Sequence, residues 1–368
     1  MLVEERREAI LRAVEQRGAV KVKELAAEMG VSAVTLRQDV RDLAARGLVA
    51  RVHGGVMPLA TERSAATDTG DAAARQQPQA EAAAQAQAHP RHTLGLVVPP
   101  GDYYYPEVIR GVQDAARTHG FRVVLAVSGE TLTANQEQVR RLAAAGVDGL
   151  LLMPRAGLGP VDGTERWLSG LEMPTVLMER RVGPGAGRVE QVASDHAYGA
   201  GLAVRHLAGL GHERIALVAR VESPNTPLIS EGYAAAVRSL GLPRGPEHHI
   251  RTAAEPDAAV GRFEEFVQEA LAGKVSAALV HNDLDAVTLV GLLQTRGLRV
   301  PQDLAVVTYD DEVAELNDVP LTAVAPPKRA VGAWAVELMR RRLADPAPPL
   351  AELLLRPELR VRASCGHG

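Results

Sequence analysis

The sequence predicts an α/β protein with a small N-terminal winged helix-turn-helix and a larger, doubly wound body of two subdomains. Three observations lead to this prediction. A chain of 368 residues has room for two or three domains. Residues 60–92 contain no large apolar side chain and therefore separate two parts that can fold independently. Beyond them, short apolar runs alternate with helical patterns, which is typical of parallel sheets covered by helices on both faces.

The N-terminal part is expected to contain three short helices, at residues 4–17, at 22–29 and after a turn at 30–32. Ser32 is a suitable N-cap for the third helix. Apolar residues recur at helical spacing and predict a small core of Ile10, Ala13, Val14, Val22, Leu25, Ala26, Met29, Leu36, Val40 and Leu43. Residues 48–55 alternate as a β segment before a Gly-Gly turn, which completes a winged helix-turn-helix pattern.

The third helix has a polar outer face that suits the major groove of DNA, where Arg can read guanine and Gln can read adenine. An alternative is that Arg37 and Arg41 are solvent-exposed residues of the helix surface without a role in binding. The residues expected to contact DNA are Ser32, Ala33, Thr35, Arg37, Gln38, Arg41, Arg51 and His53.

Residues 58–92 are expected to form a flexible, Ala/Gln-rich linker between a DNA-binding domain at 1–57 and a body at 93–364. Residues 1–57 carry ten Lys/Arg and eight Asp/Glu, whereas the rest of the chain carries 31 and 37. A polyanion is therefore expected to bind the N-terminal part.

The body is expected to alternate strands with helices of about 10–16 residues, the first helix opening at Pro106. So many alternating strands and helices would be unusual for a single sheet, and two similar subdomains are therefore expected. The expected strands are 93–99, 122–128, 148–153, 175–178, 189–194, 214–219, 277–281 and 304–310.

Residues 5–11 and 22–56 resemble the DNA-binding head of the DeoR family of bacterial regulators, which typically shows V-S-x-x-T-I-R-R-D-L and ends in R-V-H-G-G. Residues 51–55 match the ending, and Gln38 replaces the second arginine, which leaves the sequence preference open. The resemblance implies binding to double-stranded operator DNA. In the first motif the matching residues are Val31, Ser32, Thr35, Arg37 and Asp39.

Nearly all of residues 93–364 resemble the effector domain of LacI/GalR-type regulators, which is similar to periplasmic sugar-binding proteins. Matching stretches include LGLVVP (94–99), VDGLLLMP (147–154) and HNDLDAV (281–287). The resemblance implies a type I periplasmic-binding-protein-like fold, three chain crossings between subdomains, and a sugar or nucleobase effector in the cleft. DeoR-type regulators normally carry a different body, so the chain resembles a hybrid.

Transferred residue by residue, the resemblance implies effector contacts at Tyr103, Tyr104, Tyr105, Glu179, Asn282, Asp283 and Asp310. Most of these residues follow apolar strand patterns, where ligand clefts of α/β proteins form. Other interpretations remain open. The three tyrosines could form an interface, Asp283 and Asp195 could be N-caps, and Asp311 could be a solvated turn residue.

The arginine that anchors ligands in this family is absent, because its two possible positions here are Pro227 and Ile229. Another cation could replace it, or the ligand could differ from the usual sugars. The other cations considered are Arg155, Arg180 and Arg181.

Several classes of protein are not expected. The chain has one cysteine, Cys365, and no zinc-ligand spacing, so we expect no metal, no cofactor and a reducing cytoplasm. The charged N-terminus argues against a signal peptide, and no apolar run approaches the ~20 residues of a membrane helix. Residues 183–187 are Gly-rich but precede a strand pattern, so a phosphate loop is not expected. The alternatives to a regulator are a sugar-binding protein without DNA binding and, less favoured, an enzyme.

The expected assembly is a homodimer whose two heads bind an approximately palindromic operator. A hinge helix of the LacI/GalR type is not recognisable between Pro58 and His92. A flexible linker would span roughly 30 Å, so coupling would act through effective concentration or through contacts of head and body.

Overall fold

The computed structural model of the chain divides into two compact units, Met1–Gln77 and Pro78–Gly368. The structure describes residues 6, 9–14, 20, 21, 25, 28, 29, 36, 40, 43, 49–52 and 55–58 of the first unit. In the second unit it describes residues 92–100, 103–129, 131–154, 163–251, 261 and 263–366.

The N-terminal unit contains a three-stranded antiparallel sheet in the order β1-β3-β2. The wing predicted at residues 48–55 corresponds to β2 (Val49–Val52), which pairs with β3 (Gly55–Pro58), and β1 (Val20–Lys21) pairs with the other edge of β3. One cluster of buried side chains contains Ile10, Ala13, Val14, Val20, Leu25, Leu36, Val40 and Leu43, and Met29 packs against it. The helical apolar stripes are thus confirmed, whereas the predictions for Val22 and Ala26 lie outside the described residues.

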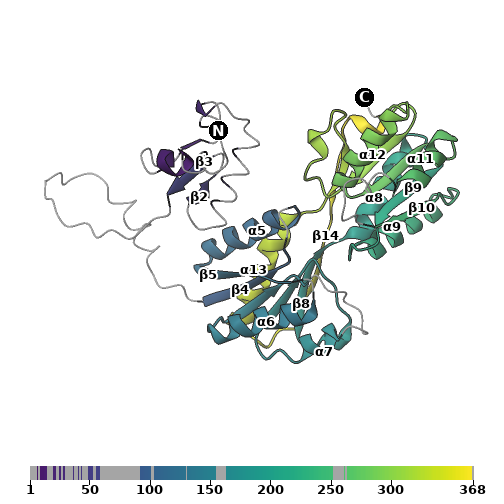
Figure 1. Ribbon diagram of the computed structural model, residues 1–368. Helices are drawn as coiled ribbons and strands as arrows, with labels where there is room; N and C mark the ends of the chain where they lie inside the picture. Colours follow the sequence, from purple (N-terminus) through teal and green to yellow (C-terminus); the bar gives the residue numbers. More distant parts are fainter. Residues whose placement is uncertain are drawn as a thin grey trace, which may run out of the picture. The chain divides into compact units, whose positions relative to one another are not determined.

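The body has two lobes, each built around a six-stranded sheet (Figure 1). Lobe 1 has a fully parallel sheet in the order β14-β8-β7-β6-β4-β5. Its elements are β4 (His92–Val98), α5 (Tyr105–Thr118), β5 (Phe121–Val127), α6 (Leu132–Ala144), β6 (Gly149–Leu152), α7 (Thr164–Ser169), β7 (Thr175–Met178), β8 (Val189–Ser194), α13 (Lys328–Ala344) and β14 (Glu352–Leu355).

Lobe 2 has the order β10-β9-β11-β12-β13-β15, in which only β15 is antiparallel to its neighbour. Its elements are α8 (His196–Gly209), β9 (Ile215–Arg220), α9 (Thr226–Ser239), β10 (Glu247–Ile250), α11 (Glu264–Leu271), β11 (Ala277–His281), α12 (Asp283–Thr295), β12 (Ala305–Tyr309), β13 (Thr322–Ala325) and β15 (Glu358–Arg360). All eight predicted body strands are present, and β10, β13, β14 and β15 are additional.

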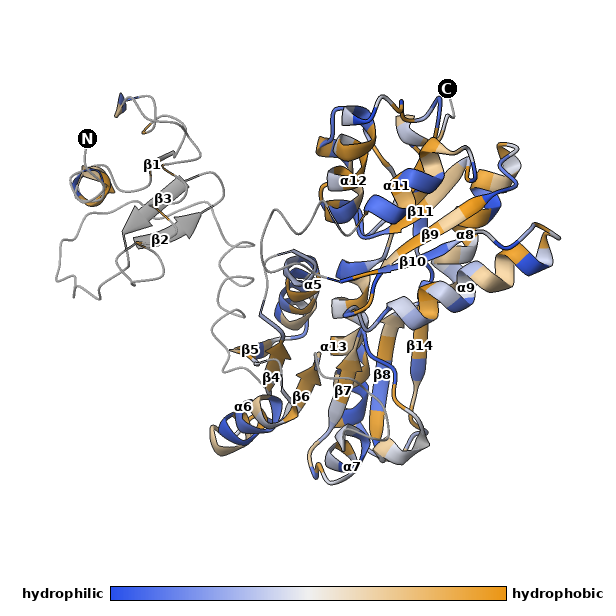
Figure 2. Ribbon diagram, turned by 45° about the vertical axis from the view of Figure 1, so that its right-hand side comes forward, coloured by the Kyte–Doolittle hydropathy of each residue, from blue (hydrophilic) through white to orange (hydrophobic). Residues whose placement is uncertain are grey.

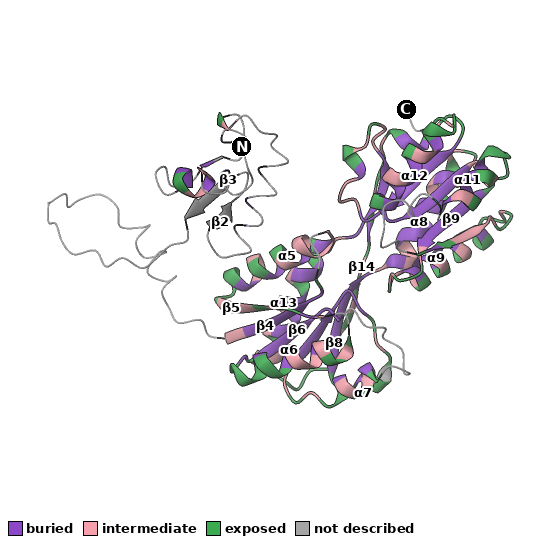
Figure 3. Cartoon of the chain, viewed as in Figure 1, coloured by how far each residue is buried: buried purple, intermediate pink, exposed green. Residues whose placement is uncertain are grey.

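Each sheet is covered on both faces, as the continuous apolar strands predict. In lobe 1, α5 and α13 contribute to one core and α6 and α7 to the other. In lobe 2, α8 and α9 cover one face and α11 and α12 the opposite face. The central strands are apolar in Figure 2 and buried in Figure 3, so the two sheets form the rigid base from which the loops at the strand ends project.

The chain crosses between the lobes three times, as the family resemblance implies. The crossings join β8 to α8, β13 to α13 and β14 to β15. The predicted linker at 58–92 begins and ends on strand residues, because β3 includes Pro58 and β4 starts at His92; residues 59–91 lie outside the described part.

Two glycines allow α5 and α13 to pack closely. A Cβ atom on Gly111 would lie 2.0 Å from the carbonyl oxygen of Arg329, and one on Gly332 would lie 2.2 Å from that of Val108. Any larger residue at either position would push the helices apart. This contact matters for the site, because α5 and α13 both begin beside it.

Candidate functional site

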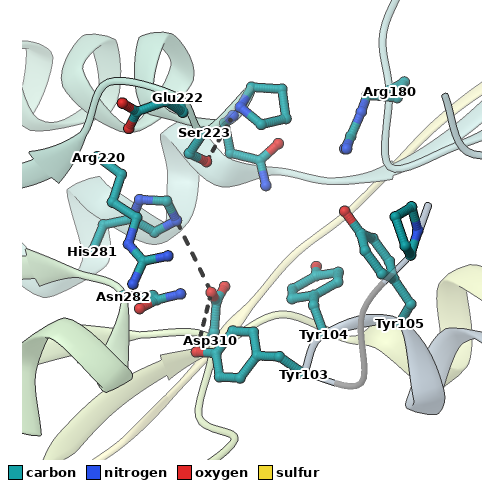
Figure 4. A pocket seen from close by; sticks show the side chains of 13 residues that line it. Tyr103, Tyr104, Tyr105, Arg180, Arg220, Glu222, Ser223, His281, Asn282 and Asp310 are labelled. Atoms are coloured by element: carbon teal, nitrogen blue, oxygen red, sulfur yellow. Dashed lines mark hydrogen bonds and ion pairs between the residues drawn. The ribbon is translucent and has the colours of Figure 1, made fainter. Parts of the chain in front are cut away.

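A cavity of about 230 Å³ lies where the carboxyl ends of the strands of both lobes face each other (Figure 4). Its lining comes from the β4–α5 loop and the end of β7 in lobe 1, and from the ends of β9, β11 and β12 in lobe 2. The lining residues are Pro100, Tyr103, Tyr104, Tyr105, Arg180, Arg220, Glu222, Ser223, Pro224, Asn225, His281, Asn282 and Asp310.

The strand orders explain this position. In each sheet the first strand, β4 or β9, has its sequence neighbour on one side and the next strand, β6 or β11, on the other. Loops diverge above such a switch point and leave a crevice. Residues 103–105 follow β4 and residues 222–225 follow β9, so the two switch points contribute opposite walls of one cavity.

Asp310 lies at the end of β12 and is only 4% exposed. Its φ of 84° is in the left-handed region, which non-glycine residues rarely adopt and which recurs at functional sites. One carboxylate oxygen, Oδ2, lies 3.4 Å from the Tyr103 hydroxyl group and 4.0 Å from Nε2 of His281. The other, Oδ1, has no hydrogen-bond partner among the residues that the structure describes. A buried acceptor without a partner at the wall of a cavity is suited to accept a hydrogen bond from a ligand.

Burial raises the pKa of Asp310 to about 6, with Lys328 opposing the rise and Asp283 adding to it. Burial also lowers the pKa of the neighbouring His281 to about 3, and the electrostatic effects of the nearby His196 and Arg220 side chains add to this. At neutral pH this wall of the cavity therefore presents a carboxylate beside an uncharged imidazole.

Asp283 is buried and is not part of the cavity lining. One of its oxygens accepts a hydrogen bond from the Tyr103 hydroxyl group. The other accepts hydrogen bonds from the backbone N–H groups of Glu312, Val313 and Ala314, at 2.6, 2.7 and 3.1 Å. Asp283 thus holds the segment after Asp310 in place, and it reaches the cavity only through Tyr103.

Glu179 is buried behind Tyr104 and is also absent from the lining. It accepts hydrogen bonds from the Tyr104 hydroxyl group (2.8 Å) and from the backbone N–H (3.0 Å) and hydroxyl group (2.8 Å) of Ser194. Burial would raise its pKa, but the His196 imidazole, 3.6 Å away, together with these donors lowers it to about 2. Glu179 is therefore a fixed anion at the first crossing between the lobes.

The remaining predicted residues differ in whether they line the cavity. The three tyrosines and Asn282 line the cavity, and the Asn282 side chain also caps α12 by accepting from the N–H of Asp285. Asp195 caps α8, as the alternative interpretation had it. The interpretation of Asp311 as a solvated residue is wrong, because its carboxylate is 3% exposed and pairs with Arg360 and Arg362.

Of the cations proposed to replace the missing family arginine, Arg180 lines the cavity. Arg181 instead pairs with Glu352 at 2.8 Å and does not contribute to the lining, and Arg155 lies outside the described residues. Arg220 and His281 also line the cavity, and neither is among the residues predicted from the sequence. Each is the last residue of a buried strand, which is the signal that located Asp310.

Nearly all of the predicted DNA contacts lie outside the described residues. Ser32, Ala33, Thr35, Arg37, Gln38, Arg41 and His53 lie outside the described residues, and of Arg51 the structure gives only its place in β2. Within the described ranges no cluster of His, Cys, Asp or Glu could hold a metal ion. Among those same residues no helix is both long enough and apolar enough to span a bilayer.

Comparisons with known proteins agree with this architecture. Residues 6–61 match the DeoR-like helix-turn-helix domain family, and residues 204–365 match the periplasmic binding protein-like domain family. The chain is similar to the HTH-type transcriptional repressor PurR of Vibrio atlanticus (strain LGP32), with 28% identity over 279 residues that cover 74% of this chain and 80% of that protein.

Two solved structures extend the similarity of the body. A LacI family transcriptional regulator from Mycobacterium smegmatis has a TM-score of 0.60 and 27% identity, covering 74% of this chain and 98% of its own. A LacI family transcriptional regulator from Enterococcus faecium with bound ribose has a TM-score of 0.59 and 23% identity, with the same two coverages. The predicted pairing of a DeoR-type head with a LacI-type body is thus confirmed.

Proposed function

We propose that this chain, in which a DeoR-like helix-turn-helix domain precedes a periplasmic binding protein-like domain, is a transcriptional repressor controlled by a small molecule. Its relatives are PurR and LacI-family regulators rather than enzymes, and we propose no catalytic role. The observation that supports ligand control best is the cavity between the strand ends of the two lobes, with the unpartnered oxygen of Asp310 at its wall.

In this proposal the effector is a sugar or a related small metabolite that contacts Tyr103, Tyr104, Tyr105, Asn282 and Asp310 directly. Aromatic rings provide stacking surfaces, and the amide and carboxylate bind hydroxyl groups. Glu179 and Asp283 act indirectly by fixing Tyr104 and Tyr103. The cavity volume of about 230 Å³ is below the roughly 300–1,000 Å³ of drug-sized pockets and suits one or two rings.

The DNA would be read by Ser32, Ala33, Thr35, Arg37, Gln38, Arg41, Arg51 and His53, as the sequence predicts. Two heads of a homodimer would bind two half-sites of a near-palindromic operator in the cytoplasm. A ligand that touches both lobes favours one lobe arrangement over another, and this difference in free energy is what couples the cavity to the operator. The linker that the sequence predicts at residues 58–92 would then join the two parts.

The full chain can be tested by selecting binding sequences from a pool of random duplexes and titrating the enriched duplex at several salt concentrations. We expect affinity to fall steeply as salt rises, since binding releases counterions from the phosphates. Adding D-ribose, D-xylulose, D-glucose, D-cellobiose or hypoxanthine should then change the affinity in at least one case. Sugar binding without enrichment of any duplex would instead support the alternative of a sugar-binding protein that does not regulate transcription.

A further inference from the structure

Arg220 ends strand β9 and is held by a carboxylate from a different element. Its Nε atom donates a hydrogen bond to Oδ2 of Asp285, in the first turn of α12. The Asp285 side chain is 1% exposed and that of Arg220 is 23% exposed. The pairing therefore takes place below the cavity surface and leaves the outer part of the guanidinium facing the cavity that Arg220 lines.

The guanidinium is oriented toward the acceptors of lobe 2. In Figure 4 it points toward the part of the cavity where Asn282 and Asp310 lie. Burial would lower the pKa of Arg220, but Asp285 and, more weakly, Tyr103 and Asp310 raise it, so these groups are within electrostatic reach of one another. The cavity thus combines a planar, fixed donor with a carboxylate acceptor on the same wall, an arrangement that fits two adjacent ligand oxygens.

The opposite wall carries a second guanidinium. Arg180, only 5% exposed, donates from Nε to the Pro154 carbonyl oxygen (2.8 Å) and from Nη1 to its neighbour's carbonyl oxygen (2.6 Å). Across the part of the chain that the structure describes, no carboxylate forms an ion pair with it. The cavity lining therefore contains two guanidiniums, of Arg180 and Arg220, and two carboxylates, of Glu222 and Asp310. A third carboxylate, that of Asp285, lies behind Arg220.

We propose that Arg220, positioned by Asp285, is a specificity-determining residue that binds adjacent hydroxyl groups of an uncharged polyhydroxylated ligand. The proposal rests on the proposed function, since it concerns the effector of the same cavity. Asp285 neutralises Arg220 from behind, so an anionic group on the ligand gains little from this guanidinium while it is repelled by Asp310. The Asp285 carboxylate thereby selects against sugar acids without touching the ligand.

The test compares D-ribose with D-ribonate, which has the same carbon number and carries a carboxylate. The full chain is titrated with each by calorimetry at pH 7.5. The native protein should bind the neutral sugar more tightly. Arg220→Met should weaken ribose binding by roughly 10–100-fold, the loss expected for hydrogen bonds to a charged group, and Arg220→Lys should weaken it less because the charge remains.

Asp285→Asn distinguishes an electrostatic role of Asp285 from a purely structural one, because only the electrostatic role predicts a change in ligand selectivity. It removes the charge behind Arg220, and the ratio of ribose to ribonate affinity should shift toward ribonate by at least tenfold. Arg244→Met is the matched control, because Arg244 lies in the same lobe and pairs with Glu247 away from the cavity. This control should leave both affinities unchanged, and thermal unfolding checks that each variant is folded.

The outcomes separate this inference from the proposed function. Unchanged ribose binding by folded Arg220→Met, or an unchanged selectivity ratio in Asp285→Asn, overturns the inference and leaves the repressor proposal standing. Tighter binding of ribonate than of ribose by the native protein also overturns it. If D-ribose, D-xylulose, D-glucose and D-cellobiose all fail to bind, the inference and the sugar effector fail together, whereas salt-dependent duplex binding would still support the DNA-binding part.

Discussion

The hydroxyl group of Tyr103, in lobe 1, donates a hydrogen bond to the carboxylate of Asp283, in lobe 2. The same hydroxyl group lies 3.4 Å from Oδ2 of Asp310. One side chain of the β4–α5 loop therefore connects the lobes directly, at the wall of the cavity that a ligand would occupy. A ligand in the cavity would therefore lie beside this contact between the lobes.

Replacing Tyr103 by Phe should loosen the contact between the lobes. The substitution removes the donor and leaves one oxygen of a buried carboxylate without its partner, which costs about 1–3 kcal/mol of unfolding free energy. Urea denaturation measures this change. Tyr105→Phe is the control, because no hydrogen bond of the Tyr105 hydroxyl group occurs among the described residues, and it should alter stability by much less. Equal effects of the two substitutions would show that the contact of Tyr103 with Asp283 is unimportant.

Ligand binding should weaken in acid because of Asp310. Its pKa of about 6 lies above the ordinary value, so the carboxylate is ionised above pH 6 and becomes protonated below it. A ligand hydroxyl group donates best to the ionised form, and affinity should fall by up to about tenfold per pH unit below 6. The charged and titratable groups around it are Lys328, Asp283, Glu312, Tyr103, Arg220, His196 and His281.

Calorimetry between pH 5 and 8 follows this effect, and Asp310→Asn should abolish the change near pH 6. The same substitution should also change the free energy of unfolding. A folded-state pKa above the unfolded one means that Asp310 favours folding at low pH and that this contribution is lost as pH rises through about 6. Asp310→Asn should therefore change the free energy of unfolding, relative to the native protein, more favourably at pH 8 than at pH 5. The expected difference between the two pH values is roughly 1–3 kcal/mol. A uniform shift at both pH values would contradict the raised pKa.

The close packing of α5 on α13 makes Gly111 sensitive to substitution. In Gly111→Ala the added methyl group would overlap the carbonyl group of Arg329, so the unfolding free energy should fall by about 1–3 kcal/mol. Gly291 in α12 is the matched helical control, because nothing lies within 4 Å of a Cβ atom there. Gly291→Ala should stabilise the protein by about 0.5–1 kcal/mol through helix propensity. Thermal and urea unfolding of the pair distinguish the two signs.

Arg37→Ala should weaken binding to the selected duplex by about 1–3 kcal/mol and relax base preference at one position, if Arg37 contacts guanine in the major groove. Competition with duplexes mutated one base pair at a time measures both effects. Ligand binding by the body should be unaffected, which serves as the internal control. Undiminished affinity with intact base preference would place Arg37 outside the DNA interface.

Much of the fold could be predicted because the strands of the body are short but continuous apolar runs, which are typical of sheets buried on both faces. β10, β14 and β15 were not predicted. They are edge strands of three or four residues, and β10 (EHHI) and β15 (ELR) consist mostly of polar residues. Their formation depends on a neighbouring strand that supplies hydrogen bonds, and a local pattern does not show that neighbour.

The site shows the same limit. Asp310, Asn282 and the tyrosines were predicted because polar and aromatic residues follow apolar strands at known places in the resembling family. The pairing of Arg220 with Asp285 was not, because it joins residues 65 positions apart whose proximity depends on the order of β9 and β11. Asp283 was predicted to contact the effector, whereas in the structure it accepts hydrogen bonds from backbone N–H groups of residues 312–314.

The three crossings have a consequence for how the molecule can be made. Lobe 1 takes its last helix and its edge strand from residues 328–355, after the ribosome has already delivered nearly all of lobe 2. Neither lobe is formed by one continuous segment of the chain. Dividing the chain at any single position therefore leaves at least one lobe without all the strands of its sheet. During translation, lobe 1 therefore exposes apolar surface until residues 328–355 have been synthesised. A chain that terminates before them has two incomplete lobes.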